Sequence, residues 1–217
     1  MDFDEFLYAY PKMHKITLAK DYKGKEYQAA MSPKDRLDID MSFIEDAKEA
    51  AVLVYIYPDK DDQTHIVLTL RAKYDGDHSS EISLPGGKKE AQDETLKDTA
   101  KRETREELGL GPHCIDYVVE LTPLYIPTSN FMVATFMAFY IDDVPEFKNN
   151  KEVVEFIEIK TDDLIDDKYV STEILTTSSG EEIEVPCFKF GKHIVWGATA
   201  MVLNEVKELF KLTSNLV

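Results

Sequence analysis

The sequence predicts an α/β fold, with a mixed β-sheet that carries helices on both faces as an α/β/α sandwich. Two observations support this prediction. Apolar, β-branched segments typical of strands are interspersed with segments of helical periodicity. The run at 131–141 is apolar on both faces, as in a central strand covered from both sides. With 217 residues, 43% of them hydrophobic, the chain is long enough for one domain with additions.

The individual elements follow from local patterns. We expect a short helix at 3–10, an irregular polar segment at 21–36 and a second short helix at 42–50 capped by Ser42. The expected strands are "AAVLVYIYP", "THIVLTLR", "CIDYVVEL" and "FMVATFMAFYI". A helix is expected from Glu94 to Leu108, because it lacks internal Gly and Pro and is followed by Gly109 as a C-cap. Strands and a short helix near 162–166 then lead to an amphipathic helix at 193–212 that includes Trp196.

The domain organisation is expected to be simple. Residues 1–48 form an N-terminal extension that packs on the core, and residues 49–217 form the main domain with its C-terminal amphipathic helix. The chain has 42 acidic and 25 basic residues and a net charge of −17. This balance disfavours nucleic-acid and anionic membrane partners, because both are bound through Lys and Arg. A local positive pocket could still hold a small anionic molecule.

Targeting and redox signals are weak. The N-terminus "MDFDEFLYAYPK" lacks the basic and apolar regions of a signal peptide. The longest apolar runs fall short of the roughly 20 residues that a membrane helix needs. Cys114 and Cys187 belong to no CxxC or Cys/His cluster, so we expect two ordinary thiols. A cytoplasmic protein is the expectation.

One segment concentrates acidic residues. Glu103, Glu106 and Glu107 are spaced i, i+3 and i+4, so they share one face of the expected helix. Alone, such a face is most often a solvated acidic surface. Carboxylates this close repel each other, and a hard divalent cation such as Mg²⁺ would reverse that repulsion because it takes oxygen ligands.

The surrounding residues resemble the Nudix box, G-x5-E-x7-R-E-U-x-E-E-x-G-U. The residues in register are Glu94, Arg102, Glu103, Glu106, Glu107, Gly109 and Leu110. Lys88 stands at the glycine position and Thr104 at an aliphatic one. Counted from Gly87 instead, the acid is Asp93 and the loop is one residue longer.

The resemblance implies a Nudix-type sandwich and a metal-dependent pyrophosphohydrolase. Glu103, Glu106 and Glu107 would bind Mg²⁺ or Mn²⁺, with Arg102 turned inward to orient the carboxylates. Gly86 and Gly87 would let the backbone turn tightly and approach the substrate.

Upstream, "LTLRAKYDGDHSSEISLPGG" resembles the coenzyme A diphosphatase signature, L-L-T-x-R-[SA]-x3-R-x3-G-x3-F-P-G-G. The matching residues are Leu68, Thr69, Arg71, Ala72, Pro85, Gly86 and Gly87, while Gly76, Ser80 and Leu84 depart from it. The resemblance implies hydrolysis of coenzyme A or a derivative to 3′,5′-ADP and 4′-phosphopantetheine. Arg71, Lys88 and His78 are the predicted substrate-binding side chains.

Other readings remain open. The substrate could be another nucleoside diphosphate derivative, such as ADP-ribose, an NDP-sugar or a dinucleotide, or the domain could be an inactive nucleotide sensor. Glu152 or Glu155 is a candidate general base. Lys89 is expected to lie in a solvated turn, and Trp196 is expected to serve in packing. Both are favoured over contact with the substrate. The expected partner is a coenzyme A-like small molecule, and the expected assembly is a possible homodimer.

Overall fold

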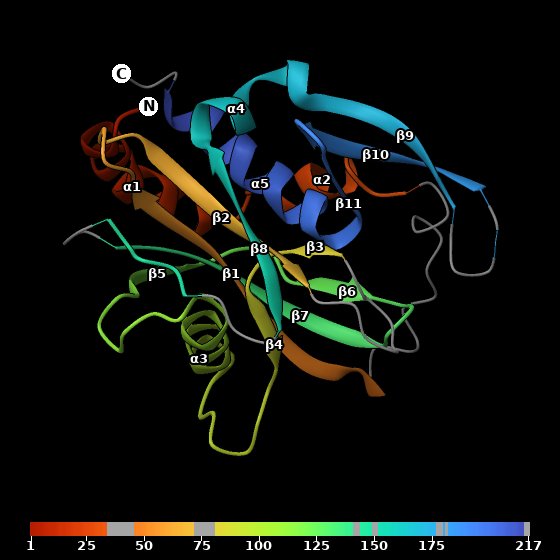
Figure 1. Ribbon diagram of the computed structural model, residues 1–217, viewed down its shortest axis with the longest axis horizontal. Coiled ribbons are helices and arrows are strands. Elements are labelled where there is room, and N and C mark those ends of the chain that lie inside the picture. The colour runs from red at the N-terminus through yellow and green to blue at the C-terminus, as the bar shows by residue number, and fades with distance from the viewer. Residues whose placement is uncertain are drawn as a thin grey trace.

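A computed structural model describes residues 1–33, 46–71, 81–140, 144–148, 152–176, 180 and 182–214. Eight strands of these residues form one mixed sheet (Figure 1). They are β1 (Lys48–Pro58), β2 (Thr64–Arg71), β3 (Ile82–Ser83), β4 (Gly86–Lys88), β5 (Asp116–Glu120), β6 (Leu124–Ile126), β7 (Phe131–Phe139) and β8 (Val153–Lys160). The order is β3-β2-β1-β7-β5, with β4 paired to β1, β6 to β7 and β8 to β2. Parallel pairing of β1 with β7 makes the sheet mixed.

The remaining elements cover the sheet. The helices are α1 (Phe3–Thr17), α2 (Gly24–Ala29), α3 (Leu96–Leu108), α4 (Thr161–Ile165), the 3₁₀-helix η3 (Asp167–Tyr169) and α5 (Gly197–Ser214). A smaller antiparallel sheet consists of β9 (Val170–Thr176), β10 (Glu182–Phe190) and β11 (His193–Trp196). None of the helices in the described ranges is long and apolar enough to cross a membrane.

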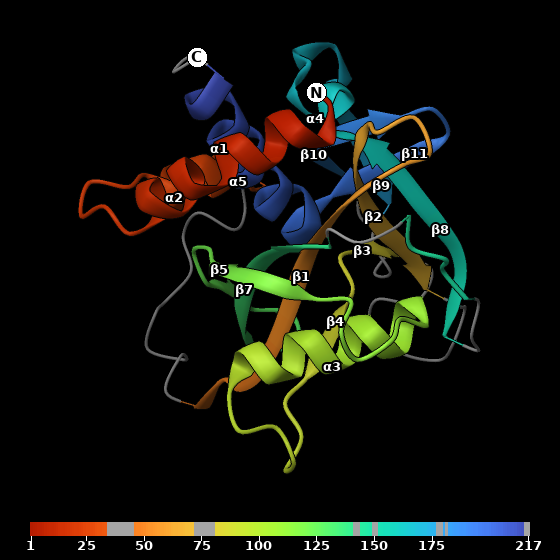
Figure 2. The ribbon, with the colours of Figure 1, turned by 90° about the vertical axis from the view of Figure 1, so that its left-hand side faces the viewer.

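The strand β1 divides the interior into two cores, because successive side chains of a strand point to opposite faces. Val54 and Ile56 are fully buried in the core that α1 and α5 cover. Leu53 and Tyr55 are fully buried in the core on the α3 side. Figure 2 shows α3 on one side of the sheet and α1, α2 and α5 on the other. The predicted sandwich with helices on both faces is confirmed.

The carboxylate-bearing helix α3 has a defined end at each side. Thr95 is its N-cap and forms a capping box with Asp98, in which each side chain bonds the other residue's backbone N–H. Gly109 ends the helix with φ 68°, the left-handed conformation that glycine adopts at little cost. The helix predicted from Glu94 therefore begins at Leu96 and ends where the sequence indicated.

The outer elements differ from the predictions in three places. The first helix continues to Thr17 through Pro11, because its spaced apolar side chains stay buried on the core. The polar segment at 21–36 contains the helix α2. The expected helix at 42–50 lies partly outside the described residues, and its last three residues, 48–50, belong to β1.

The C-terminal helix starts later than predicted. His193–Trp196 is a strand, β11, that pairs with β10 and places Trp196 opposite Cys187. Gly197 follows with φ 61° and lets the chain turn from the strand into α5. The β-branched pair Ile194-Val195 favours a strand, and helical periodicity alone did not reveal it.

Candidate active site

Arg102 is the centre of the polar network on α3. Its Nε and Nη2 each donate to Asp93 at 2.9 Å. Its Nη1 donates to Glu103 at 2.9 Å and to Glu106 at 3.2 Å, and Nη2 also reaches the carbonyl of Lys88 at 3.1 Å. One guanidinium thus joins the helix, the acid of the preceding loop and the end of β4.

The structure decides between the two registers of the box. Asp93 is buried, bonded to Arg102 in two-pronged fashion, and accepts from the Thr99 hydroxyl and the Glu90 N–H. Glu94 is exposed, although it fits the pattern counted from Arg102. The acid position is therefore Asp93, and the register counted from Gly87 is correct. The Arg102 guanidinium holds the pKa of Asp93 far below its usual range.

Two carboxylates of α3 lie against the glycines of β4. A Cβ added at Gly87 would stand 2.5 to 2.7 Å from the carboxyl atoms of Glu103, so a side chain at this position would displace that carboxyl group. The backbone N–H of Gly86 donates to Glu107 at 3.3 Å. The strand β4 pairs with β1 and thereby fixes both glycines beneath the helix. Glycine at 87 therefore lets the Glu103 carboxyl group lie where a side chain would otherwise be.

Arg71 faces the same carboxylate from β2. Its Nη2 lies 3.6 Å from Oε1 of Glu107, whose side chain is only 2% exposed, while Arg71 itself is 29% exposed. Burial raises the pKa of Glu107 to about 7, whereas the Arg71 charge and the Gly86 N–H act in the opposite direction. Burial likewise raises the pKa of Glu103. Arg71 therefore has a guanidinium that is partly open to solvent beside a buried acid.

The donor set fits a hard divalent cation. Burial makes both Glu103 and Glu107 costly to ionise, and the charge of Glu103 adds to that cost at Glu107. Glu106 is 61% exposed and bonded to Arg102. Across the described ranges, no three His, Cys, Asp or Glu side chains are grouped so that they could hold a metal alone. Mg²⁺ needs no such cage, because it binds through one or two carboxylates, waters and substrate phosphates.

The remaining candidate residues have different outcomes. His78 lies outside the described residues, as do Gly76 and Ser80. The negative charge of Glu152 contributes to the raised pKa of Glu107. Glu155 instead pairs with Lys192 at 3.1 Å and lies 3.3 Å from His193. These contacts leave Glu152 and not Glu155 near the carboxylates.

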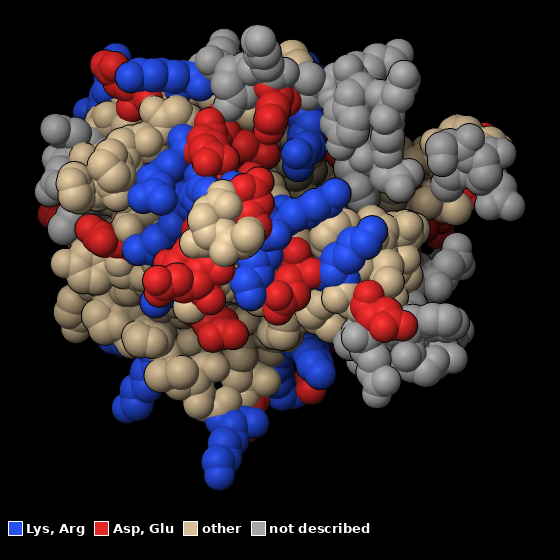
Figure 3. Space-filling view, turned by 90° about the horizontal axis from the view of Figure 1, so that it is seen from below, with Lys and Arg blue, Asp and Glu red and all other residues tan. Residues whose placement is uncertain are grey.

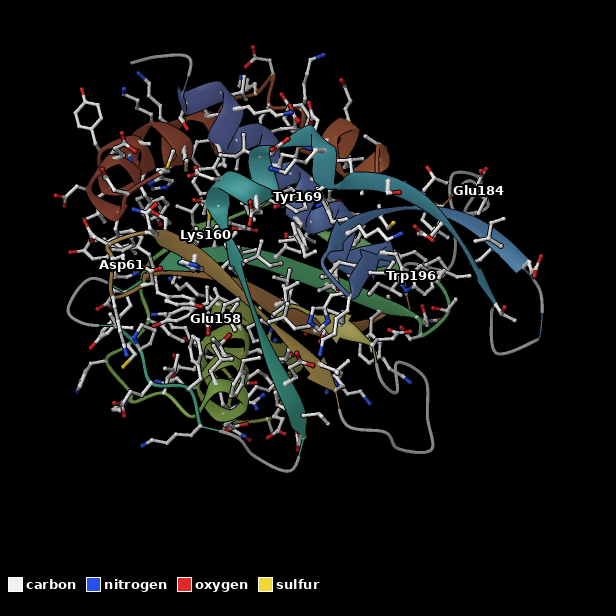
Figure 4. All side chains as sticks on the ribbon, turned by 45° about the horizontal axis from the view of Figure 1, so that its top comes forward. Asp61, Glu158, Lys160, Tyr169, Glu184 and Trp196 are labelled. Carbon is white, nitrogen blue, oxygen red and sulfur yellow. The ribbon has the colours of Figure 1, made fainter. Side chains whose placement is uncertain are left out.

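For Lys89 and Trp196 the sequence favoured a structural role over substrate contact. Lys89 pairs with Glu49 at 3.1 Å. Trp196 lies on β11 beside the start of α5 (Figure 4). On the face seen in Figure 3, basic and acidic side chains are interleaved. From the sequence alone, Glu94 fitted the acid position of the box as counted from Arg102, and Asp93 was the alternative. The two-pronged bond to Arg102 identifies Asp93 as that acid.

The sequence and the structure were compared with known proteins. The NUDIX domain family matches residues 47–174, more than half of the chain. Nudix hydrolase 15, mitochondrial, of Arabidopsis thaliana is 43% identical over 76 residues, which is 35% of this chain and 27% of that relative. An uncharacterised Nudix hydrolase, NudL, of Yersinia pestis (strain Pestoides F) is 25% identical over 144 residues, 66% of this chain and 71% of that protein.

The extent of these matches differs. The chain spans about a quarter of the length of the two A. thaliana relatives it matches. A Nudix hydrolase from M. smegmatis, RenU, has a similar solved structure, with 16% identity, a TM-score of 0.49, and coverage of 79% of this chain and 88% of that one. The family match includes β1 to β8 together with α3 and its carboxylates. The chain therefore belongs to the Nudix family and has the Nudix fold.

Proposed function

We propose that the protein is a metal-dependent pyrophosphohydrolase that cleaves the diphosphate bond of a nucleoside diphosphate derivative. The observation that supports it is the pair of carboxylates formed by half-buried Glu103 and buried Glu107, which lie against two glycines of β4, with Arg71 beside Glu107. Buried like charges destabilise a fold, so their presence together favours a site that binds a cation. The cation would bring an anionic substrate to the same place.

Glu103 and Glu107 would hold Mg²⁺ or Mn²⁺, with Glu106 assisting directly or through water. The ion, when bound, neutralises diphosphate charge and lowers the pKa of water. Arg102 keeps the carboxylates in place through its bonds to Asp93 and Glu103. The guanidinium of Arg71 can pair with a phosphate through two parallel hydrogen bonds. Backbone at Gly86 and Gly87 lets the diphosphate approach closely.

We infer further that the substrate is coenzyme A or a derivative, cleaved to 3′,5′-ADP and 4′-phosphopantetheine. The described signature residues support this, because Arg71 and Gly86 both lie beside the Glu107 carboxylate. β2 ends at Arg71, and Thr69 pairs with Ser83 just before Pro85 and the glycines. The loop with its acid at Asp93 also resembles that subfamily. The homodimer and the cytoplasmic location remain predictions from the sequence.

A substrate panel with Mg²⁺ and Mn²⁺, read by product mass, tests the proposal. We expect coenzyme A to exceed ADP-ribose by at least about tenfold in kcat/KM, or roughly 1.4 kcal/mol of transition-state binding. If ADP-ribose, an NDP-sugar or a dinucleotide is the better substrate, the activity class stands and the coenzyme A assignment is wrong. Binding of these nucleotides without any turnover would instead indicate a sensor.

A further inference from the structure

Two lysines and an aromatic ring meet where β1, β4 and β7 lie side by side. The ammonium of Lys88 lies 5.4 Å from the ring centroid of Phe131, and that of Lys48 lies 5.8 Å from it. The ring is half-buried, and both lysines are exposed. Cations at such distances are attracted by the face of the ring.

Strand register places these side chains on one face of the sheet. Lys48 is the partner of Phe131 across the parallel pair, and Ala50 is the partner of Lys88 across the antiparallel pair. Lys48 and Ala50 are two residues apart on β1 and share a face with Val54. Val54 belongs to the core covered by α5, so the group lies on the face opposite to α3.

Hydrogen bonds hold the backbone on both sides of this group. Arg102 donates to the carbonyl of Lys88, so the box arginine that orders the carboxylates also orders this residue. On the other side, Asn130 has a φ of 52° and accepts from the Tyr125 hydroxyl at 2.9 Å. The carbonyl of Asn130 accepts from the N–H of Lys48 at 2.9 Å. The ring that follows Asn130 is thus held at the start of β7.

Among the residues that the structure describes, no carboxylate pairs with either of the two lysines. Within the described ranges, neither Lys48 nor Lys88 forms an ion pair, although the whole chain has a net charge of −17. Lys89, the next residue, is paired with Glu49. Two exposed ammonium groups converge on one ring and form a local positive site in an acidic protein, and one of them belongs to Lys88, the residue after Gly87.

We propose that Lys48, Lys88 and Phe131 form a subsite for the nucleoside end of the substrate, and that it selects nucleosides with an additional phosphomonoester. A phosphomonoester carries nearly two negative charges near neutral pH and pairs with ammonium groups. An aromatic ring offers a face on which a base stacks. This inference rests on the proposed function, since it assigns the part of the substrate beyond the diphosphate.

Binding without metal tests the subsite directly. The probes are 3′,5′-ADP and 5′-AMP, which differ only in the 3′-phosphate, measured by titration calorimetry with EDTA present. We expect the wild type to bind 3′,5′-ADP at least about fivefold more tightly, the low end for a partly exposed charge-assisted contact. Lys48→Gln and Lys88→Gln should each reduce that ratio, whereas Lys89→Gln should retain it. Phe131→Leu should weaken both nucleotides alike.

The outcomes separate the subsite from the activity. The inference is overturned if the wild type binds both nucleotides equally, or if neither lysine variant changes the ratio. Unchanged binding of both nucleotides to Phe131→Leu would overturn the role of the ring. Turnover of coenzyme A and dephospho-coenzyme A, measured separately with Mg²⁺, tests the proposed function. Absence of turnover with the binding ratio intact would reject the activity and keep the subsite.

Discussion

Glu107 shows how burial and charge compete at one residue. Its side chain is 2% exposed, and burial raises its pKa to about 7. The nearby guanidinium of Arg71 and the N–H of Gly86 offset only part of this cost. A carboxylate held in this way is unfavourable for the fold alone, which is typical of groups that a protein retains for chemistry.

Replacing Glu107 by Gln removes one charge and keeps the shape of the side chain. We expect the rate of diphosphate hydrolysis to fall by at least about 100-fold, as when a key electrostatic group is removed from an active site. The measurement is kcat at saturating Mg²⁺, with thermal unfolding of the same sample as the control. Normal turnover in this variant would remove Glu107 from the metal site.

Asp93 and the adjacent Glu94 offer a matched pair of substitutions. Asp93→Asn breaks a nearly buried ion pair with Arg102, so it should lower the free energy of unfolding by about 3 kcal/mol. Glu94→Gln changes an exposed residue and should stay within about 0.5 kcal/mol of the wild type. Urea unfolding of both variants is the measurement. Equal effects would contradict the register that the structure shows.

The same ion pair has a defined pH dependence. Because the pKa of Asp93 is lower in the folded than in the unfolded state, its stabilisation is complete above the unfolded pKa of about 4. It is lost as the pH falls through the folded value. The stability difference between wild type and Asp93→Asn should therefore shrink below about pH 4.

At the scale of elements, β4 and α3 depend on each other through two glycines with different surroundings. A Cβ at Gly87 would meet the carboxyl end of Glu103, which is flexible enough to move. A Cβ at Gly86 would meet backbone atoms of β1, with Ala51 O at 2.3 Å and Val52 Cα at 2.7 Å. Glycine at 87 therefore keeps the Glu103 carboxyl group in place, and glycine at 86 allows β4 to pair with β1.

We therefore expect Gly87→Ala to lower activity by about tenfold or more while the melting temperature changes little, because only the carboxylate of Glu103, a proposed metal ligand, moves. Gly86→Ala should lower the melting temperature and activity together, since strand pairing must shift. Both variants are measured by kcat/KM and by thermal unfolding. A large loss of stability in Gly87→Ala with activity per folded molecule unchanged would contradict this division.

The sequence predicted elements well where local pattern and burial agree. The strand at 131–139 has a clear apolar run and the helix capped by Gly109 has a clear end, so both were predicted. Prediction from the sequence failed where tertiary contacts determine the local structure. Helix α2 is polar by itself and is held by the bonds of Gln28 to Glu205 and to Thr122. The choice of Asp93 over Glu94 depends on which side chain reaches Arg102, and spacing alone cannot determine it.

At the scale of the whole molecule, the N-terminal helices are part of the packed structure. Phe6 of α1 is fully buried, and its ring lies 6.0 Å from that of Phe210 on α5. Gln28 of α2 donates to Glu205 on α5 at 2.7 Å. These contacts join the first 30 residues to the last helix. The division of the chain into an extension of residues 1–48 and a main domain of residues 49–217 stays a prediction.

Glu205 tests how much this junction contributes. Its carboxylate is fully buried and accepts four hydrogen bonds. The donors are the Tyr22 hydroxyl, the Gln28 amide, and the N–H and the hydroxyl of Thr122. Glu205→Gln would turn an N–H₂ toward one of these donors, so it should cost about 1–3 kcal/mol of unfolding free energy. Glu208→Gln, half-buried on the same helix and 3.6 Å from Lys211, should cost within about 0.5 kcal/mol. Chemical unfolding of both variants gives the comparison. Equal losses would show that the N-terminal helices attach mainly through apolar contacts such as Phe6.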